Sequence, residues 1–264
     1  MSDNQKKYLK KLRFEKILVL FIQIFIVISF FIIWEFLAYK EYINTFIYSS
    51  PSRMLRTIKD LIVSNNLFNH IFKTLYEIII SFTLGGSLGI IIAIILYEFK
   101  FIAKVIDPFL ILLNSMPKVA LGPLIIIIAG ANIKSVIVMA LLINLIVTTI
   151  TIYNGFKNTE TNKIKLLQSF KASRFQILFY LVIPNSFNTI VSSLKLNVSM
   201  TLIGVIMGEF LVSKEGIGYL IIYGTQIFNL NLVMSGIFIL LIISFILYGI
   251  VTMIEKKLKK KRYY

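Results

Sequence analysis

The sequence has 264 residues, of which 58% are hydrophobic and 15% are charged, and its net charge is +16. Soluble domains contain roughly 45–50% apolar and about 25% charged residues. This chain has too few polar side chains to cover a globular surface, so its composition argues against a soluble enzyme and indicates an integral membrane protein. With no cysteine and one histidine, His70, the chain has no material for a disulfide framework, a thiolate metal site or a histidine cluster.

The positive charge is concentrated beside apolar segments. Most of the Lys and Arg residues lie within residues 1–16, 98–104, 155–176 and 256–262, and each segment borders a long apolar run. The positive-inside rule assigns such clusters to the cytoplasmic side, where they also contact anionic lipid. A nucleic-acid-binding protein needs a soluble basic face with aromatic platforms, which this sequence does not show. We therefore expect membrane lipid, and no nucleic acid, as a partner.

The chain begins with a basic tail, residues 1–16, and an apolar run from Ile17 to Trp34. About 18 apolar residues are enough to span a bilayer, and no A-x-A cleavage site follows the run. We interpret it as a retained first helix that ends near Tyr39. The next segment, residues 40–75, is mixed in composition. Its apolar residues at three- and four-residue spacing predict a helix on the membrane interface; they are Met54, Leu55, Ile58, Leu61 and Ile62.

Two regions marked by glycine and proline follow. Ile78 to Tyr97 is uncharged and predicts a second span, in which Gly85 and Gly89 form a small face for close helix packing. Phe101 to Ile128 is a third apolar region with three prolines, which predict a broken or kinked element. Irregular backbone at membrane depth is tolerated only inside protein or beside a water-filled cavity. We therefore expect this region at the centre of the bundle.

Three further apolar regions predict the remaining spans. They run from Ser135 to Phe156, from Phe175 to Gly208 with an interruption at Pro184, and from Val233 to Ile254. The uncharged segment before the last span, residues 216–230, forms either a re-entrant segment or a loop.

The sequence thus predicts an all-α integral membrane fold with about six transmembrane helices. We expect one transmembrane domain, residues 17–254, flanked by basic tails at 1–16 and 255–264. An even number of spans places both termini on one side, and the positive charge of the tails makes that side the cytoplasm.

No catalytic motif is present. The chain lacks G-x-x-x-x-G-K-[ST] and G-x-G-x-x-G, so we expect it to bind neither a nucleotide nor another cofactor by itself. The acids within or beside the predicted spans are widely separated in the sequence, which argues against the paired carboxylates of an intramembrane protease; they are Glu35, Glu77, Glu98, Asp107 and Glu209. We expect no active site and no metal site.

The cytoplasmic segment from Tyr153 to Pro184 is too long for a tight connection between spans, which usually has about 2–8 residues. It contains two short helical patterns, Thr161–Phe170 and Arg174–Tyr180, on either side of Lys171-Ala172-Ser173. A helical hairpin of this kind is a natural docking surface for a partner. On periodicity alone, a solvated amphipathic loop is an equally good interpretation.

This segment resembles the coupling loop of ABC-importer permeases, whose pattern is E-A-A-x3-G-x9-I-x-L-P. Anchored on Pro184, the pattern places Lys165, Leu166 and Leu167 at the E-A-A positions and Lys171 at the glycine. The coupling loop corresponds to about residues 157–183.

Other motifs, in order, are similar to signatures of the nitrate/sulfonate/taurine permeases, which include relatives for riboflavin and thiamine precursors. The similarity runs from about residue 48 to 254. Its motifs are Tyr48-Ser-Ser-Pro-Ser, Leu67 to His70, Met116-Pro-Lys-Val-Ala-Leu-Gly-Pro-Leu with Gly130, Lys171-Ala-Ser, Val182-Ile-Pro, Gly208-Glu-Phe and Gly216-Ile-Gly-Tyr-Leu.

The resemblance implies a six-helix importer permease of a bacterial-type plasma membrane, paired with a second copy or a close homologue. Two ATP-binding subunits would carry the ATP, and an external substrate-binding protein would deliver the cargo. The coupling helix, Thr161–Phe170, would seat in a groove on the ATP-binding subunit, whose closure on ATP would switch the paired bundles between two global states.

Three residues depart from the family pattern. Lys165 replaces the usual acid of the coupling motif. We expect either that Lys165 meets an acidic site on the ATP-binding subunit or that this permease pairs with a second permease whose motif is more typical. Lys171 replaces the usual turn glycine. Since lysine tolerates a positive φ poorly, we expect this turn to differ in shape or to lose its left-handed residue. Glu77 stands where these permeases often have arginine.

The translocation path is predicted to run along the broken third region and the fourth and fifth spans; its candidate residues are Asn114, Met116, Pro117, Asn144, Met200 and Glu209. These groups are mostly small, amide-bearing or apolar, which favours a small organic solute, such as a sulfonate or a vitamin precursor, over nitrate. Alternatively, Asn114 and Asn144 form hydrogen bonds between helices. The competing function is an ion-coupled secondary transporter, for which inverted repeats and midplane ion ligands are typical; neither is evident in this sequence.

Overall fold

The computed structural model describes residues 3–64 and 66–262, and every regular element within them is helical. Five helices are long and apolar enough to cross a membrane; they are α1 (Asp3–Tyr39), α4 (Asn66–Glu98), α7 (Ile133–Lys157), α11 (Phe187–Val212) and α13 (Leu230–Arg262). The sixth candidate is a bent pair whose arms meet at 91°; its parts are α5 (Lys100–Ser115), η1 (Lys118–Leu121) and α6 (Gly122–Ala129). The predicted all-α membrane fold with about six spans is confirmed.

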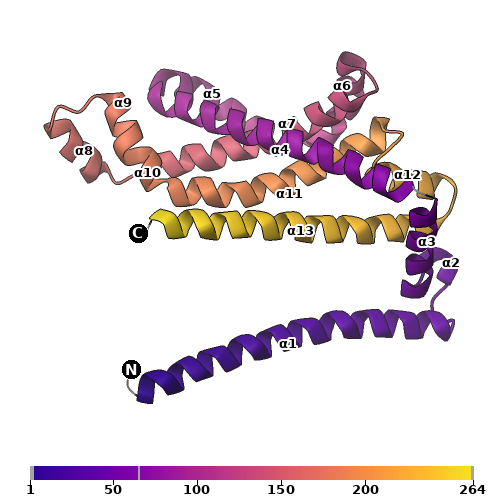
Figure 1. Ribbon diagram of the computed structural model, residues 1–264. Coiled ribbons are helices and arrows are strands. Elements are labelled where there is room, and N and C mark those ends of the chain that lie inside the picture. Colours follow the sequence, from indigo (N-terminus) through magenta and orange to yellow (C-terminus); the bar gives the residue numbers. More distant parts are fainter. Residues whose placement is uncertain (1–2, 65, 263–264) are drawn as a thin grey trace.

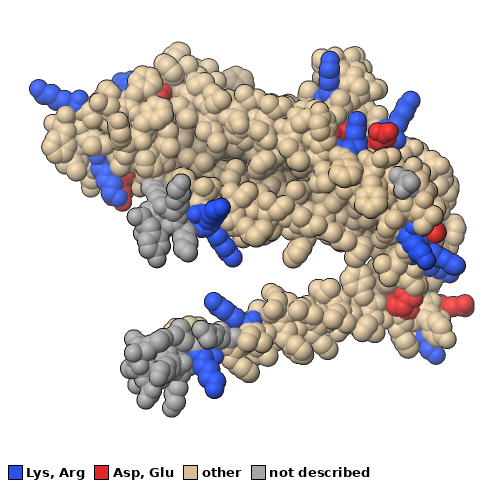
Figure 2. All heavy atoms as spheres, in the orientation of Figure 1, with Lys and Arg blue, Asp and Glu red and all other residues tan. Residues whose placement is uncertain are grey.

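The two ends of the bundle hold different elements (Figure 1). One end, which we call the α8 end, holds α8 (Thr161–Ser169), α9 (Arg174–Ile177) and both ends of the chain. The opposite end, which we call the α12 end, holds α2 (Thr45–Tyr48), α3 (Pro51–Val63) and α12 (Ile217–Gln226). On the face shown in Figure 2, Lys and Arg gather at these ends and leave an uncharged band between them.

Both predicted tails continue the neighbouring helices. The tail at 1–16 is helical from Asp3 into α1, and the tail at 255–264 continues α13 as far as Arg262; the residues beyond these points lie outside the described part of the chain. Because the two tails and α8 lie at one end of the bundle (Figure 1), the chain arrangement agrees with an even number of crossings.

Glycine residues let α4 and α7 approach closely. A Cβ atom on Gly89 would lie 2.8 Å from Cγ2 of Thr148, and a Cβ atom on Gly85 would collide with the Asn144 side chain. Carbon atoms normally pack at about 3.5–4.0 Å, so only glycine fits at these positions without a shift of the neighbour. The prediction that Gly85 and Gly89 form a packing face is confirmed, with α7 as the helix that they contact.

The α7–α11 contact is built in the same way. A Cβ atom on Gly208 would lie 2.8 Å from the Cα atom of Val136, and Gly204 faces the backbone of Ala140. Two helices whose backbones touch gain dispersion contacts that replace the weak hydrophobic driving force within lipid. With α4, which contacts both of them, α7 and α11 form the core of the bundle.

The third apolar region bends at one of its three prolines. The break falls at Met116-Pro117, whose ψ angles of 138° and 86° leave the helical region. Pro108 sits inside α5, and Pro123 occupies the first turn of α6, where the N–H that proline lacks has no intrahelical partner anyway.

The expected central position of this region is wrong for the single chain. Phe109 of α5 and Ile127 and Ile128 of α6 are 60–80% exposed, so the region lies at the edge of the bundle. The expectation followed from the broken backbone, and the break between the two helical arms comprises only two residues, Met116 and Pro117.

The predicted interfacial helix is α3, which crosses the α12 end of the bundle (Figure 1). Ser50 caps it by accepting a hydrogen bond from the Arg53 N–H at 3.4 Å, and Pro51 begins the helix. Its buried residue Met54 is 4% exposed, and the Met54 carbonyl accepts a hydrogen bond from Ser235 of α13 at 3.2 Å. The polar contact anchors the amphipathic helix to the last span.

Helix α1 stands apart from the other spans (Figure 1). None of its most apolar 18-residue window is buried in this chain. Phe31 contacts Phe238 of α13 edge to face, with ring centroids 5.9 Å apart. Most of its apolar surface is therefore free to contact lipid or another chain.

Candidate functional site

The coupling segment predicted from the sequence forms a helical hairpin that extends beyond the bundle (Figure 1). Its two arms are α8, Thr161–Ser169, and α9, Arg174–Ile177, close to the predicted helices. The first turn of α8 is supported by an ion pair between Lys163 Nζ and Glu160 Oε1 at 2.8 Å. Both partners are largely exposed, so this pair adds little to stability.

The turn between the arms retains its left-handed residue, which is Lys171 with a φ of 60°. The Lys171 N–H donates to the Gln168 carbonyl at 2.9 Å, and the Ala172 N–H donates to the Leu167 carbonyl at 3.0 Å. These two bonds form a Schellman motif, which ends a helix with one residue in the left-handed conformation. The expectation that lysine changes this turn is wrong, because the two bonds and the packing of Leu167 and Ala172 hold the conformation.

The second arm begins with a capping box. Ser173 Oγ accepts a hydrogen bond from the Gln176 N–H at 3.3 Å, and Gln176 Oε1 accepts one from the Ser173 N–H at 2.7 Å. The apolar sides of both arms pack on the bundle through one buried cluster, which includes Ile177, Leu178 and Val182. The partly buried Ile164, Leu167 and Ala172 pack against it. The hairpin is therefore packed firmly against the spans.

Pro184 lies where the hairpin enters α11. It follows a π-helical turn, η2 (Leu178–Val182), and belongs to the short helix α10 (Ile183–Asn185). A proline inside a helix removes one hydrogen bond and collides with the preceding turn, and a π-turn widens the helix enough to accommodate it. Ser186 then donates a hydrogen bond to the Gly155 carbonyl of α7 at 2.9 Å, which fixes the start of α11.

The outward face of the hairpin combines exposed apolar and basic side chains. Leu166 is 56% exposed, Phe170 74% and Phe175 60%. Beside them, a cavity of about 410 Å³ opens between the hairpin and the ends of α4 and α7, and its lining includes Lys100, Lys157, Lys165 and Arg174. Exposed aromatic groups on a fixed hairpin are typical of a contact surface.

A second polar feature is the Asn144 network inside the core. Asn144 is fully buried, and its Nδ2 atom donates to the Ser81 carbonyl at 3.0 Å and to Thr201 Oγ1 at 2.6 Å. Thr201 in turn donates to Asn197 Oδ1 at 3.0 Å, and Asn197 Nδ2 donates to the Phe82 carbonyl at 3.3 Å. The network links α4, α7 and α11, as the alternative interpretation of Asn144 predicted.

A third feature is the Glu209 network, which holds the start of α12. Glu209 is fully buried; its Oε1 accepts from Thr74 Oγ1 at 2.6 Å, and its Oε2 accepts from the Gly218 N–H at 2.5 Å. Thr74 Oγ1 accepts from the Ile217 N–H at 2.8 Å, and His70 Nδ1 accepts from the Gly216 N–H at 2.9 Å. Three successive N–H groups of this loop are thus bound by α4 and α11.

This network fixes the start of a short helix within residues 216–230. Helix α12 has 10 residues, or about 15 Å at 1.5 Å per residue, and cannot cross a hydrocarbon core of about 30 Å. It folds back on α4, α11 and α13 at the α12 end (Figure 1). Glycine is required where it begins, because Gly216 has a φ of 112° and a Cβ atom there would collide with the Glu209 carboxylate.

The six candidate path residues do not all meet in this chain. Asn114, Met116 and Pro117 are exposed at the bend between α5 and η1, and Met200 is half-buried on α11. The other two, Asn144 and Glu209, are fully buried and belong to the two networks above.

The sequence interpretation missed most of the polar partners. In α4 the residues His70, Thr74, Glu77 and Ser81 recur every three or four positions and continue into Gly85, so they share one helical face. This polar and small-residue stripe in an apolar span was the available signal. The acids that are widely separated in the sequence include one pair that the fold brings together, because Glu77 lies one turn after Thr74 on the same face of α4 and Thr74 binds Glu209.

The fold and these features define a multi-pass helical membrane protein with a helical hairpin between two of its spans. The chain belongs to the family of inner membrane components of binding-protein-dependent transport systems, whose model matches residues 85–260. It is a membrane-spanning permease subunit of an ABC importer.

Two relatives and one solved structure illustrate the similarity. A probable ABC transporter permease protein of Haemophilus influenzae is 30% identical over 82% of this chain and 87% of its own length. The putative aliphatic sulfonates transport permease protein SsuC of Bacillus subtilis is 26% identical over 87% of this chain and 83% of its own. The inward-facing MetNI methionine ABC transporter has a chain of the same fold, with a TM-score of 0.64 at 15% identity, covering 74% of this chain and 97% of that one.

Proposed function

We propose that this chain forms half of the translocation path of an ATP-driven importer for a small organic solute or anion of the sulfonate, nitrate or vitamin-precursor class. Two ATP-binding subunits hydrolyse ATP at the α8 end, and this chain contributes no catalytic group or cofactor. A substrate-binding protein delivers the solute at the α12 end. The α8 end, with both termini, faces the cytoplasm of a bacterial-type plasma membrane, and the α12 end faces outward.

The observation that carries this proposal is the hairpin of α8 and α9. Its inner side packs on α7 and the start of α11 through Ile177 and Leu178, both at most 5% exposed. Its outer side exposes Leu166, Phe170 and Phe175. A partner that binds the outer side of the hairpin can therefore move the spans through its inner side. Such a connection is required if ATP hydrolysis is to switch the translocation path between its two open sides.

Charge on the hairpin indicates what the ATP-binding subunit presents to it. Lys163, Lys165, Lys171 and Arg174 lie on or beside the exposed face, and Glu160 is paired with Lys163. Opposite charges across an interface speed association and suppress wrong partners. We therefore propose an acidic docking groove on the ATP-binding subunit, complementary to Lys165.

A second permease copy, or a close homologue, covers the apolar surface that this chain leaves open. The exposed groups lie on α5, α6 and α1 and include Phe109, Leu112, Ile127, Ile128 and Phe25. Pairing across α5 and α6 encloses the bend at Met116-Pro117 between two bundles. Asn114 and Met116 would then line the shared path.

The sulfonate class has the support of the SsuC relative, whose printed name assigns it to aliphatic sulfonates. In this chain Lys195 is not available as a free cation for an anionic solute, because its Nζ lies 2.5 Å from Glu255 Oε2. The binding protein therefore supplies most of the selection, and the path carries the solute past amide and apolar groups.

The proposal is tested by comparing two substitutions of one exposed leucine of the hairpin, Leu166. Leu166→Glu places a charge on the exposed face and is expected to abolish binding of the ATP-binding subunit and substrate-stimulated ATP hydrolysis, while the permease still folds. Leu166→Ala, the matched control, retains folding and weakens binding only in part. If Leu166→Glu binds the ATP-binding subunit and transports as the wild type does, the hairpin is not the coupling surface. ATP-independent uptake driven by an ion gradient would instead support a secondary transporter.

A further inference from the structure

Glu77 is a fully buried carboxyl group for which the described structure provides no hydrogen-bond donor. It lies in α4, its residue exposure is 0%, and neither Oε1 nor Oε2 has a donor among the described residues. It lies one turn after Thr74 on the same face of α4, and the Thr74 hydroxyl donates a hydrogen bond to Glu209 of α11. Burying an ionised carboxylate beside a second one, with no hydrogen-bond donor to either of its oxygens, has a large cost in free energy.

The partners of Glu209 decide which of the two groups is ionised. Both of its oxygens already accept hydrogen bonds, from Thr74 Oγ1 and from the Gly218 N–H. Thr74 receives a hydrogen bond from the Ile217 N–H, so its own proton points at Glu209. Donors on both oxygens stabilise the charged form of Glu209, and the proton that the pair requires resides on Glu77.

We propose that Glu77 and Glu209 form a binding site for a single proton, which closes the joint between α4, α11 and the start of α12. The Glu77 O–H donates to Glu209, so that the buried pair carries one negative charge. The hydrogen bonds that Thr74 and Gly218 donate to Glu209 stabilise this charge. Loss of the proton places two like charges in the joint and drives α4 away from α11. This inference goes beyond the proposed function and does not depend on it.

A metal cation fits the same place poorly. Around the pair the loop presents N–H groups of residues 216, 217 and 218, which point at acceptors and repel a cation. The Thr74 hydroxyl accepts from the Ile217 N–H and donates to Glu209, and His70 Nδ1 uses its lone pair for the Gly216 N–H. Two carboxyls alone provide too few ligands for Na⁺ or a divalent ion, and among the described residues no cluster of three metal-ligating side chains occurs.

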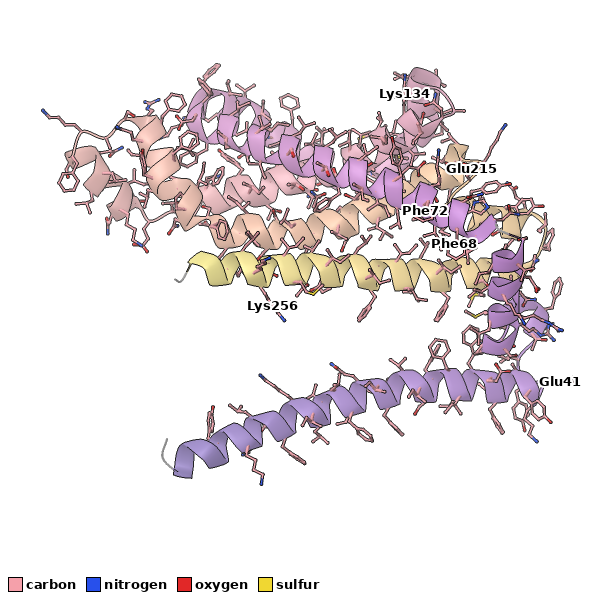
Figure 3. All side chains as sticks on the ribbon, viewed as in Figure 1. Glu41, Phe68, Phe72, Lys134, Glu215 and Lys256 are labelled. Carbon is pink, nitrogen blue, oxygen red and sulfur yellow. The ribbon has the colours of Figure 1, made fainter. Side chains whose placement is uncertain are left out.

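Few other charges reach the pair. Besides Glu209, the charged side chains that act on Glu77 are Lys73, one turn earlier in α4, and Glu215, in the loop before α12; their effects oppose each other. His70 accepts a hydrogen bond from the Gly216 N–H and stacks on Tyr219, with ring centroids 5.9 Å apart. Glu215 lies close enough to His70 to interact with it electrostatically. The spans α7 and α13 have no charged residue between 135 and 156 or between 230 and 254. Figure 3 shows the labelled Glu215 close to the α12 end.

The proton is detected directly by infrared spectroscopy of the purified full-length chain in lipid. At neutral pH the wild type is expected to show the carbonyl stretch of a protonated carboxylic acid, which disappears as the pH is raised. Glu77→Gln removes the band, because its amide donates to Glu209 without a titrating proton. The control Glu160→Gln, which changes an exposed carboxylate, leaves the band unchanged. A wild-type spectrum without the band, or a band that survives in Glu77→Gln, overturns the proposal.

Thermal unfolding against pH provides a second readout that needs neither transport nor a partner. The pair holds one proton in the folded chain and releases it on unfolding. The unfolding equilibrium constant therefore rises up to tenfold per pH unit from the ordinary pKa of an unfolded glutamate, about 4.3, up to the pKa of the folded pair, and levels off above it. We expect that dependence in the wild type and in Glu160→Gln, and its loss in Glu77→Gln. Equal pH dependence in wild type and Glu77→Gln contradicts the proposal, as does a stabilisation by Na⁺ over choline that Glu77→Gln removes, which would indicate a cation site.

Discussion

The close contact between α7 and α11 predicts that a single methyl group is not tolerated at Gly208. The Cβ atom of Gly208→Ala would lie 2.8 Å from the Cα atom and 3.0 Å from Cγ1 of Val136, well inside the normal carbon–carbon separation of about 3.5–4.0 Å. The nearest atom belongs to backbone, so the helices themselves must separate. Overpacking of this kind costs about 1–3 kcal/mol.

Helix propensity acts in the opposite direction and is measured by a control. Alanine is about 1 kcal/mol more favourable than glycine in a helix. Gly249 of α13 isolates that effect, because a Cβ atom there has no neighbour within 4 Å. We expect Gly249→Ala to stabilise the chain by up to about 1 kcal/mol, and Gly208→Ala to be less stable than Gly249→Ala by about 1–3 kcal/mol.

The assay is reversible unfolding of the purified chain in mixed micelles, monitored by circular dichroism. Both substitutions are glycine to alanine within a spanning helix, so their intrinsic propensity terms cancel in the difference. If Gly208→Ala and Gly249→Ala have the same stability, or if Gly208→Ala is the more stable of the two, the proposed backbone contact between α7 and α11 is refuted.

Three other substitutions test the buried network and the hairpin. Asn144→Ala leaves Thr201 without its donor and is expected to cost about 1–3 kcal/mol, measured by the same unfolding assay; no loss would mean that the network is not formed. Lys171→Val places a β-branched residue at a φ of 60° and is expected to lower the stability of the hairpin by about 1–2 kcal/mol, whereas Lys171→Gly is neutral or slightly stabilising. Hydrogen exchange of the 161–177 amides compares the two variants, and equal exchange rates would contradict the Schellman turn. Ser173→Ala removes the capping box with Gln176 and is expected to cost about 1 kcal/mol, seen as faster exchange of the α9 amides; unchanged protection would argue against the cap.

Local sequence patterns predicted much of the fold because a membrane span depends mainly on its own residues. Apolar length located α4, α7, α11 and α13, and three- and four-residue spacing located α3 and the arms of the hairpin. Glycine spacing identified the packing face at Gly85 and Gly89, since a missing Cβ is a property of the residue itself. The position of α5 and α6 at the edge was not predictable in this way, because it depends on which surfaces another chain covers.

The buried networks depend on contacts that sequence spacing does not encode. Asn144 and Ser81 are 63 positions apart, and His70 and Gly216 are 146 positions apart. For the same reason, Glu77 and Glu209 were read as isolated acids, although both lie on faces that turn toward each other in the bundle. The conformation of Lys171 was misjudged because residue preference favours a negative φ, whereas the hydrogen bonds of the turn and the packing of Ala172 determine the observed one.

The most direct test of the importer assignment is purification of the tagged chain from its native membrane in mild detergent, followed by mass spectrometry and an ATPase assay. We predict that an ATP-binding subunit is recovered in a stoichiometric ratio, that the preparation hydrolyses ATP, and that Leu166→Glu removes both the subunit and the activity. Recovery of this chain without an ATP-binding subunit and without ATPase activity, in several detergents that preserve its helical fold, would contradict the account.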